Sequence, residues 1–355
     1  MIASNDPGSR ATARQPQTRM FGEAAEAADA IARQLQRNAG VLDRLATRLR
    51  ANPPPFVVTC ARGSSDHAAT FAKYAIETQL GRVTASASPS VGTIYASQQH
   101  LEHALYLVIS QSGRSPDLVR SAQAARHAGA HVVALVNVED SPLAAVAETV
   151  IPLQAGVETS VAATKSYLCT LAAILDLVAR WKGNPALAAA VRALPETLHA
   201  AWQMDWSTLV DGLSNVDNLF VLGRGLGLGA AQEVALKLKE TCGLHAEAFS
   251  TAEVRHGPMA LVRPDFPVLV LAQHDESLAS TLELAGEFRL RGANVWIASS
   301  ENYGQGHLSV PATMHPACTP LAEIVSFYRA ANTLALRRGH NPDLPPHLKK
   351  VTETF

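Results

Sequence analysis

The chain has 355 residues, of which 47% are hydrophobic and 17% charged, and its formal net charge is -1. This composition is typical of a globular protein of about two domains, and the small net charge predicts a protein that binds neither nucleic acid nor a membrane surface. No apolar run approaches the ~18 residues that a membrane span needs. The four cysteines form neither CxxC pairs nor metal-ligand spacings, which predicts no metal site and a reducing, cytoplasmic location.

The N-terminal segment differs from the rest of the chain. Residues 1–19 include Pro7, Gly8 and Pro16 but lack the apolar core of a secretory signal, so we predict a disordered leader there. From residue 20 onward, Ala, Glu, Leu and Arg recur at helical spacing until the prolines that follow Asn52. We therefore expect an N-terminal helical arm over residues 20–52.

Strands and helices alternate through residues 53–200. The apolar strand Phe56–Cys60 precedes a helix over Asp66–Leu80, the strand Leu105–Ile109 precedes a helix over Pro116–Ala128, and a further strand covers Val132–Val136. Such alternation is typical of an α/β fold with a parallel sheet. We predict the first domain over this range.

The second half of the chain repeats the first. Three short segments of the first half recur in the same order in the second half. The first of these segments ends in Arg-Gly in both copies. The segments that begin at Asn218, Val268 and Arg291 match those that begin at Pro55, Tyr106 and Ala128. This repetition indicates duplication and predicts a second domain over residues 201–340, followed by a tail over residues 341–355.

Small hydroxyl residues follow the strand that ends at Ile109. Ser110, Ser112 and Ser115 lie between the carboxyl end of that strand and the start of a helix, where backbone N–H groups and the helix dipole attract an anion. Gly113 permits a close approach of the backbone. The pattern predicts a phosphate site, with a Ser-rich turn as the alternative. The second copy has alanine and histidine in place of the first two serines, so only the first copy is expected to bind phosphate.

Titratable residues gather in the second copy instead. Glu240 lies near the end of a helix that starts near Gly229, and a carboxylate at that end is disfavoured by the helix dipole, which suits a base. The alternative is a solvated glutamate paired with Lys237. His256 lies in a turn, where a surface histidine is the alternative. His67, early in the first helix, is predicted to be a helix-face residue and not a catalyst.

The glycines between Gly223 and Gly229 are similar to a dinucleotide-binding fingerprint. The last position of the GxGxxG form is not glycine, however, and no acidic residue ends a following strand at the usual distance. The stretch also belongs to the internal repeat. Nucleotide binding is therefore not predicted, and no cofactor is expected.

Taken together, these stretches resemble the sugar isomerase (SIS) domain family, most closely the isomerase half of glutamine:fructose-6-phosphate aminotransferase and its stand-alone deaminase relatives. The likeness spans about residues 20–355. The resemblance implies two tandem flavodoxin-like domains, and a homodimer that shares its active sites between subunits. The matching motifs are Arg62–Ser65, Ser110–Gly113, Ser160–Lys165, Ala235–Glu240, His245–Glu247 and Glu253–Pro258.

The resemblance also implies roles for individual residues. Glu240 would move a proton between the first two sugar carbons, His256 of the partner subunit would open the sugar ring, and Lys349 in the tail would close over the open-chain substrate. An exposed tail lysine is the alternative for Lys349. Such proton transfer needs no metal. The implied substrate-binding residues are Arg62, Gly63, Ser64, Ser65, Ser110, Gln111, Ser112 and Ser115 at the phosphate, and Val161 and Ala163 along the sugar.

Departures from the family pattern shape the expected activity. The synthase has a glutaminase domain led by a cysteine, for which this chain offers no room, so use of glutamine is not expected. Arg62, Arg114 and Ala163 stand where the synthase has cysteine, an acidic residue and serine. The run from Arg62 to Ala69 resembles the deaminase branch. The resemblance thus implies conversion of glucosamine 6-phosphate to fructose 6-phosphate and ammonia.

Three alternatives to this activity stay open. They are aldose–ketose isomerisation of a phosphosugar, deamination of galactosamine 6-phosphate, and a non-catalytic sugar-phosphate sensor. The first two cannot be separated from the deaminase by sequence, because discrimination at one hydroxyl depends on pocket contacts. The sensor is disfavoured because Glu240, His256 and Lys349 occur together and no DNA-binding segment is present.

Overall fold

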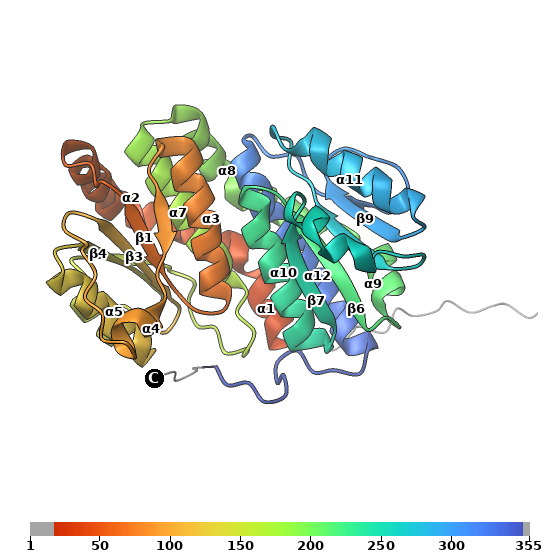
Figure 1. Ribbon diagram of the computed structural model, residues 1–355, viewed down its shortest axis with the longest axis horizontal. Helices are drawn as coiled ribbons and strands as arrows, with labels where there is room; N and C mark the ends of the chain where they lie inside the picture. Colours follow the sequence, from red (N-terminus) through yellow and green to blue (C-terminus); the bar gives the residue numbers. More distant parts are fainter. Residues whose placement is uncertain (1–17, 351–355) are drawn as a thin grey trace, which may run out of the picture.

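Two five-stranded parallel sheets form the framework of the protein. A computed structural model describes residues 18–350 and places one sheet in each half of the chain (Figure 1). In the first sheet the strands lie in the order β2-β1-β3-β4-β5. These strands are β1 (Val57–Cys60), β2 (Thr84–Ser86), β3 (Leu105–Ser110), β4 (His131–Val136) and β5 (Thr149–Pro152).

The second sheet has the order β10-β9-β8-β6-β7. Numbered within its own half, this order reads 2-1-3-4-5, as in the first sheet, and it is the flavodoxin-like order. The prediction of two tandem flavodoxin-like domains is confirmed, while their origin by duplication and the domain limits stay predictions. The strands are β6 (Asn218–Gly223), β7 (His245–Ser250), β8 (Pro267–Leu271), β9 (Asn294–Ser299) and β10 (His307–Ser309).

Helices cover both faces of each sheet. In the first half they are α1 (Arg19–Ala25), α2 (Ala27–Ala51), α3 (Ser64–Leu80), α4 (Pro89–Thr93), α5 (Pro116–His127), α6 (Pro142–Val146), α7 (Lys165–Lys182) and α8 (Pro185–Trp202). In the second half they are α9 (Ser207–Leu213), α10 (Leu226–Cys242), α11 (Leu278–Leu290) and α12 (Thr319–Arg337). Three short 3₁₀ turns complete the set: η1 (Glu253–His256), η2 (Pro258–Leu261) and η3 (Pro316–Cys318).

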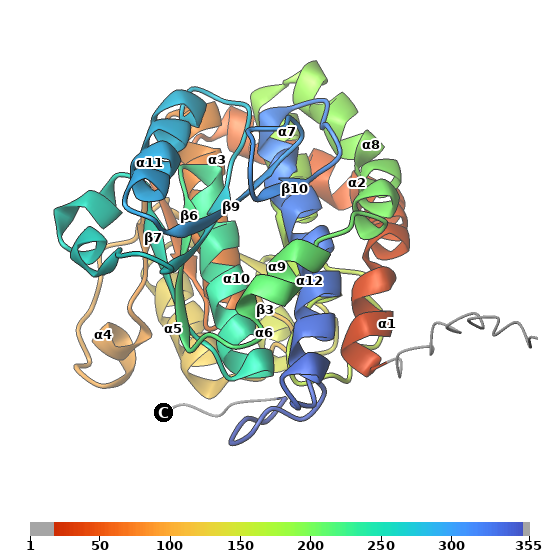
Figure 2. The same cartoon turned by 90° about the vertical axis from the view of Figure 1, so that its right-hand side faces the viewer.

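The N-terminal arm consists of two helices and not one. Helix α1 ends at Ala25, and α2 continues from Ala27 to pack on α7. Figure 2 shows α1 beside α12, which it contacts. Residues 1–17 of the predicted leader lie outside the described residues. Its last two residues are ordered, because Arg19 begins α1 and Thr18 caps that helix by accepting a hydrogen bond from the Phe21 N–H.

Side chains of the central strands are buried on both faces, as expected for a parallel sheet. Alternate residues therefore enter different cores. In β3, Leu105, Leu107 and Ile109 belong to a large core between the two domains, whereas Tyr106 and Val108 face a smaller outer core under α5. The second sheet has its own outer core. The shared central core fixes the two domains against each other.

Helices α3 and α10 make the closest contact between the domains. A Cβ atom at Gly229 of α10 would lie 2.6 Å from the His67 carbonyl oxygen and 3.0 Å from the Phe71 nitrogen of α3. Glycine at this position therefore lets one helix backbone lie directly against the other. As a result, the first turn of α3 lies beside the polar face of α10.

Both helices begin earlier than the sequence pattern predicted. Helix α3 starts at Ser64 and not at Asp66, and α10 starts at Leu226 and not near Gly229. In each case a glycine with positive φ precedes the helix, Gly63 at 56° and Gly225 at 55°. Only glycine adopts this conformation readily, so the chain can turn sharply from the strand into the helix.

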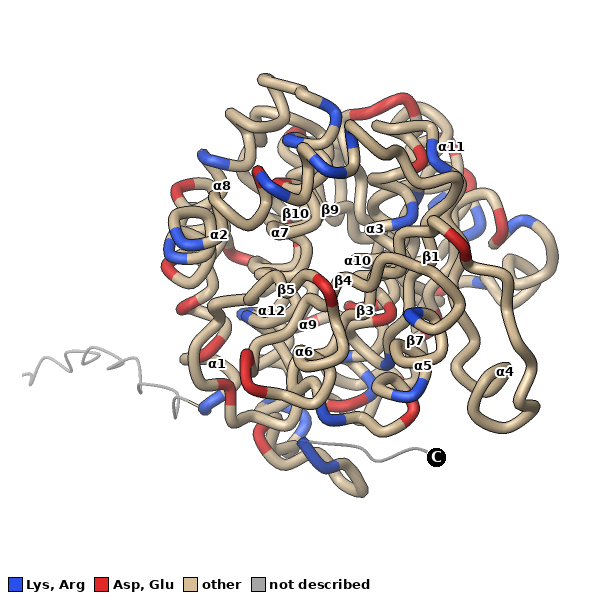
Figure 3. Tube along the Cα trace, turned by 90° about the vertical axis from the view of Figure 1, so that its left-hand side faces the viewer, with Lys and Arg blue, Asp and Glu red and all other residues tan. Residues whose placement is uncertain are grey.

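Charge is distributed evenly over the fold. Segments with Lys or Arg and segments with Asp or Glu are both scattered over the trace in Figure 3, in keeping with the formal net charge of -1. Within residues 18–350, no helix is both long and apolar enough to cross a membrane. The four cysteines are buried and unpaired, and burial raises the pKa of the Cys60 thiol to about 11.

Candidate active site

Two loops meet at the carboxyl edge of the first sheet. Residues 61–65 follow β1 and residues 111–115 follow β3, and the two strands are neighbours, with Cys60 opposite Val108. The chain reverses its winding at this point, because β2 lies on one side of β1 and β3 on the other. Ligands of open α/β sheets bind at such a switch point. All eight residues predicted to hold the phosphate lie in or directly beside these two segments.

The loop after β3 has a tight, glycine-dependent shape. Gly113 has φ +62°, and a Cβ atom there would lie 2.1 Å from Ser141 Oγ. The Gly113 N–H donates to Ser110 Oγ at 3.1 Å, and the Arg114 N–H donates to Ser112 Oγ at 3.3 Å. Such local bonds are typical of a serine turn. In both of them the serine hydroxyl is the acceptor, so its own hydrogen is not used. Each can still donate its hydrogen to a phosphate oxygen.

Arg62 links the two loops. Its Nε donates to Asp117 Oδ2 at 2.9 Å, and Asp117 lies in the first turn of α5 with its side chain almost fully buried. The Arg62 side chain itself is half exposed. A guanidinium held here adds positive charge beside the hydroxyl groups and the start of α5.

Helix α10 presents three charged residues along one face. Glu233, Lys237 and Glu240 follow each other at helical spacing, and Lys237 Nζ lies 3.4 Å from Glu233 Oε1 and donates a hydrogen bond to Glu240. Lys237 and Glu233 have no exposed side-chain surface, whereas the Glu240 side chain is 18% exposed. Glu240 is therefore paired with Lys237, as the alternative reading proposed, but the pair lies in the interior and only its outer carboxylate reaches solvent.

Ser64 connects this charged face to the phosphate loops. Lys237 Nζ donates to Ser64 Oγ at 3.1 Å, and Ser64 Oγ donates to Glu233 Oε1 at 3.2 Å. Ser64 is the first residue of α3, next to Ser65 and the loop after β1. One lysine thus contacts both a predicted phosphate ligand and the predicted base.

Glu233 was not among the predicted site residues, although its spacing from Lys237 and Glu240 places all three on one helix face. It accepts hydrogen bonds from Ser64 and from the Tyr328 hydroxyl at 3.0 Å, and its Oε2 lies 3.1 Å from His67 Nδ1. Burial opposes ionisation of Glu233, but Lys237 and His67 outweigh it and lower the pKa of the carboxyl. The neighbouring carboxylates likewise raise the pKa of Lys237 against the effect of burial.

Val161 and Ala163 lie half-buried in the loop between β5 and α7. Two buried carboxylates hold this loop. Glu23 of α1 accepts hydrogen bonds from the N–H groups of Thr159 and Ser160, and Glu158 accepts from that of Thr164. The loop is therefore a fixed wall and not a free segment.

Among the described residues, neither His256 nor Lys349 is bonded to the charged face of α10. His256 is exposed at the end of η1, and no hydrogen bond joins it to Glu240 among the described residues. Lys349 is exposed near the end of the described tail. Its neighbour Lys350, which the sequence did not single out, donates to the Ser160 carbonyl.

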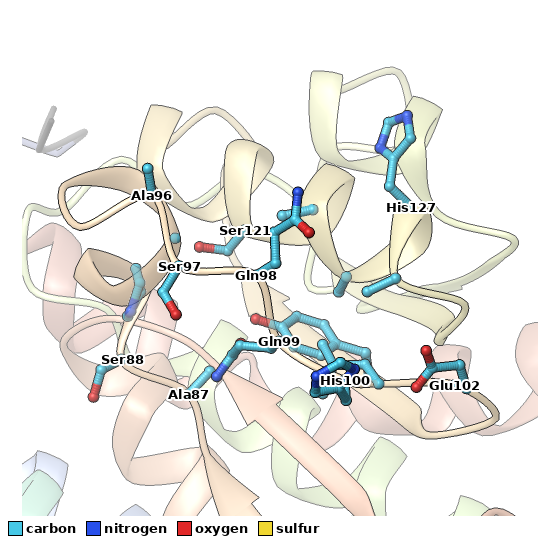
Figure 4. A pocket seen from close by; sticks show the side chains of 17 residues that line it. Ala87, Ser88, Ala96, Ser97, Gln98, Gln99, His100, Glu102, Ser121 and His127 are labelled. Carbon is cyan, nitrogen blue, oxygen red and sulfur yellow. The ribbon is translucent and has the colours of Figure 1, made fainter.

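A separate cavity lies on the other side of the first domain. Its volume is about 590 Å³, and it lies between the segment that contains α4 and helix α5. Figure 4 shows Ser97, Gln98, Ser121 and His127 around it. None of the predicted site residues lines this cavity.

In the second domain, the hydrogen-bond donors at the corresponding position are bonded to other groups of the protein. Gln273, which matches Gln111 in the repeat, accepts a hydrogen bond from the Gly227 N–H at 3.1 Å and donates to Glu323 Oε2 at 3.3 Å. Glu323 belongs to α12 and has no exposed surface. The Gln273 and Glu323 side chains therefore bond to each other and to the backbone at the position where the first copy has its serine loop.

Comparison with known proteins identifies the family. A profile of the SIS domain matches residues 56–180 and 212–303. The chain belongs to the SIS domain family. Glutamine–fructose-6-phosphate aminotransferase (isomerizing) of Symbiobacterium thermophilum is 30% identical over 325 residues, which cover 86% of this chain and 52% of that protein. The chain thus spans about half the length of this SIS relative.

Solved structures with the same fold include stand-alone SIS proteins. A candidate phosphosugar isomerase from Silicibacter pomeroyi DSS-3 is 42% identical, with a TM-score of 0.88, and the match covers 92% of this chain and 100% of that one. Glucosamine-6-phosphate deaminase from Thermotoga maritima is 20% identical, with a TM-score of 0.75, over 95% of this chain and 100% of that one. At 20% identity the likeness shows the fold alone.

The buried Glu323 predicts a specific dependence of stability on pH. Burial raises the pKa of its carboxyl from 4.5 to about 8. Because the folded-state pKa exceeds the unfolded one, the stabilisation is fully present below pH 4.5 and is lost as the pH rises toward 8. We expect Glu323→Gln to raise the free energy of unfolding by about 1–3 kcal/mol more at pH 8 than at pH 5 in urea titrations. Equal effects at both pH values would contradict this, and Glu196→Gln, at an exposed position of α8, serves as the control.

Proposed function

We propose that the chain converts glucosamine 6-phosphate and water to fructose 6-phosphate and ammonia. The observation that carries this proposal is the contact of Lys237 with both Ser64 and Glu240. Through these two bonds, Lys237 connects the predicted phosphate loops to the Glu240 carboxylate, which reaches solvent. A substrate bound by its phosphate at one end would place its reacting carbons at the other end, near the carboxylate.

The proposed steps need one base and one acid at different atoms. After the ring opens, Glu240 takes the proton from C2 of the aldehyde form and returns it to C1, through an enolamine. The C1 oxygen gains a proton as the enolamine forms, and the nitrogen loses one as C1 is protonated. This gives the imine at C2, to which water adds, and ammonia leaves as the ketone forms. Lys237 stabilises the negative charge that develops on the enolamine oxygen, because it is a buried cation beside the base.

His256 would open the ring from a second copy of the chain. It is exposed on η1 and does not contact Glu240 in its own chain. We therefore assign ring opening to His256 of the partner subunit, and propose a homodimer with two shared sites. Lys349 in the tail would cover the open-chain sugar.

A plain phosphosugar aldose–ketose isomerase is the second candidate. It is favoured by the 42% identity to the Silicibacter pomeroyi protein, which is named a candidate phosphosugar isomerase. Both reactions use the same C1–C2 proton transfer, so Glu240 has the same role in each. They differ in whether C2 carries nitrogen or oxygen, and only nitrogen at C2 gives an imine that water hydrolyses to release ammonia.

The deciding assay measures ammonia and fructose 6-phosphate released from glucosamine 6-phosphate. We expect the two products in equal amounts, and Glu240→Gln to lower kcat by about 10²–10⁴-fold, because the amide cannot accept the proton. Glu196→Gln, at an exposed position on α8, is the matched control and should keep full activity. Interconversion of aldose and ketose phosphates without ammonia would favour the second candidate, and full activity of Glu240→Gln would refute the role of Glu240 as the base in either reaction.

Mixing two inactive variants tests the shared site. If Glu240 and the partner subunit's His256 form one site, subunit exchange between Glu240→Gln and His256→Gln homodimers creates heterodimers with one intact site. Half of the dimers are then heterodimers, so about a quarter of the wild-type activity should return. No recovery after verified exchange would place both groups within one chain.

A further inference from the structure

The C-terminal tail joins the second domain to the first. After α12 ends at Arg337, the chain runs along the lower edge of the molecule toward the first domain (Figure 1). Asp343 attaches it to the start of α1, where its two carboxylate oxygens accept hydrogen bonds from the N–H groups of Arg19 and Met20, both at 2.8 Å. These are unpaired donors of a helix N-terminus, so a carboxylate there stabilises both elements.

Lys350 forms the second attachment. Its Nζ donates to Glu158 Oε2 at 3.1 Å and to the Ser160 carbonyl at 2.7 Å. The Glu158 side chain has no exposed surface, whereas that of Lys350 is 25% exposed. A residue from the tail thus supplies the cation for a carboxylate buried in the first domain. Burial of such a carboxylate without a cation is costly, so the contact favours the docked tail.

Glu158 also organises the loop along the predicted sugar pocket. It accepts hydrogen bonds from the Thr164 N–H at 3.0 Å, the Ser166 N–H at 3.1 Å and the Ser166 hydroxyl at 2.6 Å. These bonds close the loop over residues 158–166, which contains Val161 and Ala163 and leads into α7. Lys350 therefore bonds directly to the first part of the loop, at the Ser160 carbonyl. It is linked to the start of α7 indirectly, because Glu158 bonds to both Lys350 and Ser166.

We propose that Lys350 is a positioning residue that docks the tail on the loop of Val161 and Ala163 and thereby holds the adjacent Lys349 over the bound phosphosugar. The inference rests on the proposed function for the role of Lys349, but the docking contact itself does not depend on any substrate. Two residues that are neighbours in sequence thus have separate tasks. Lys350 attaches the backbone, and Lys349 remains exposed and can reach the substrate.

Hydrogen exchange of the unliganded protein tests the docking. Amide exchange of residues 341–350, followed by mass spectrometry, should become at least about tenfold faster in Lys350→Met and stay near wild type in Lys350→Arg, which can still donate to Glu158 and Ser160. Lys182→Met, at an exposed position at the end of α7, is the matched control. Unchanged tail exchange in Lys350→Met would overturn the proposal whatever the substrate is.

Steady-state kinetics test the positioning. With glucosamine 6-phosphate, Lys350→Met should lower kcat about tenfold or more and change KM about threefold or less, because the phosphate site is intact while Lys349 is displaced. Combining Lys350→Met with Glu158→Gln removes the unpaired buried charge and should restore thermal stability without restoring kcat. Recovery of kcat along with stability would show a purely structural role. If the wild type releases no ammonia from this substrate, the proposed deaminase fails, and the exchange experiment alone decides whether Lys350 docks the tail.

Discussion

The buried charges on α10 are the constraint on which the site depends. Lys237 and Glu233 have no access to water, so each must be paired within the protein, and their partners come from α3, α12 and the end of α10 itself. Gly229 permits this by letting α3 lie against α10. The result is that Ser64, fixed at the start of α3, shares a lysine with Glu240. Loss of this packing would separate the phosphate loops from the base.

Duplication explains why two similar domains perform different tasks. Both retain the same strand order and a positive-φ glycine before the helix that follows their first strand. In the first copy the serine hydroxyls at the switch point can donate to an anion. In the second copy the Gly227 N–H is already bonded to Gln273, and the Gln273 amide is bonded to Glu323. Helix α10 contributes its charged face instead. The proposed active site therefore draws on both copies, and the shared central core holds the two copies against each other.

The sequence predicts the parts of this fold that have strong local patterns. The strands that became β1, β3, β4, β6 and β8 are apolar runs, and the predicted phosphate loops directly follow two of them, β1 and β3. The short edge strands β2, β5 and β10 were missed, since three or four residues carry little periodicity. Glu233 and Lys350 were missed for another reason: their importance lies in contacts with α3, α12 and the loop before α7, which no local pattern encodes. His67, predicted to be a helix-face residue, lies on that face but bonds to Glu233.

The most direct measurement is a crystal structure of Glu240→Gln with glucosamine 6-phosphate bound. The account predicts the phosphate among the hydroxyls of Ser110, Ser112 and Ser115, with C1 and C2 of the sugar next to the side chain of residue 240, which reaches solvent. The sugar would lie along Val161 and Ala163. A sugar phosphate bound elsewhere, such as in the cavity between the α4 segment and α5, or with its C1–C2 bond turned away from residue 240, would contradict the account.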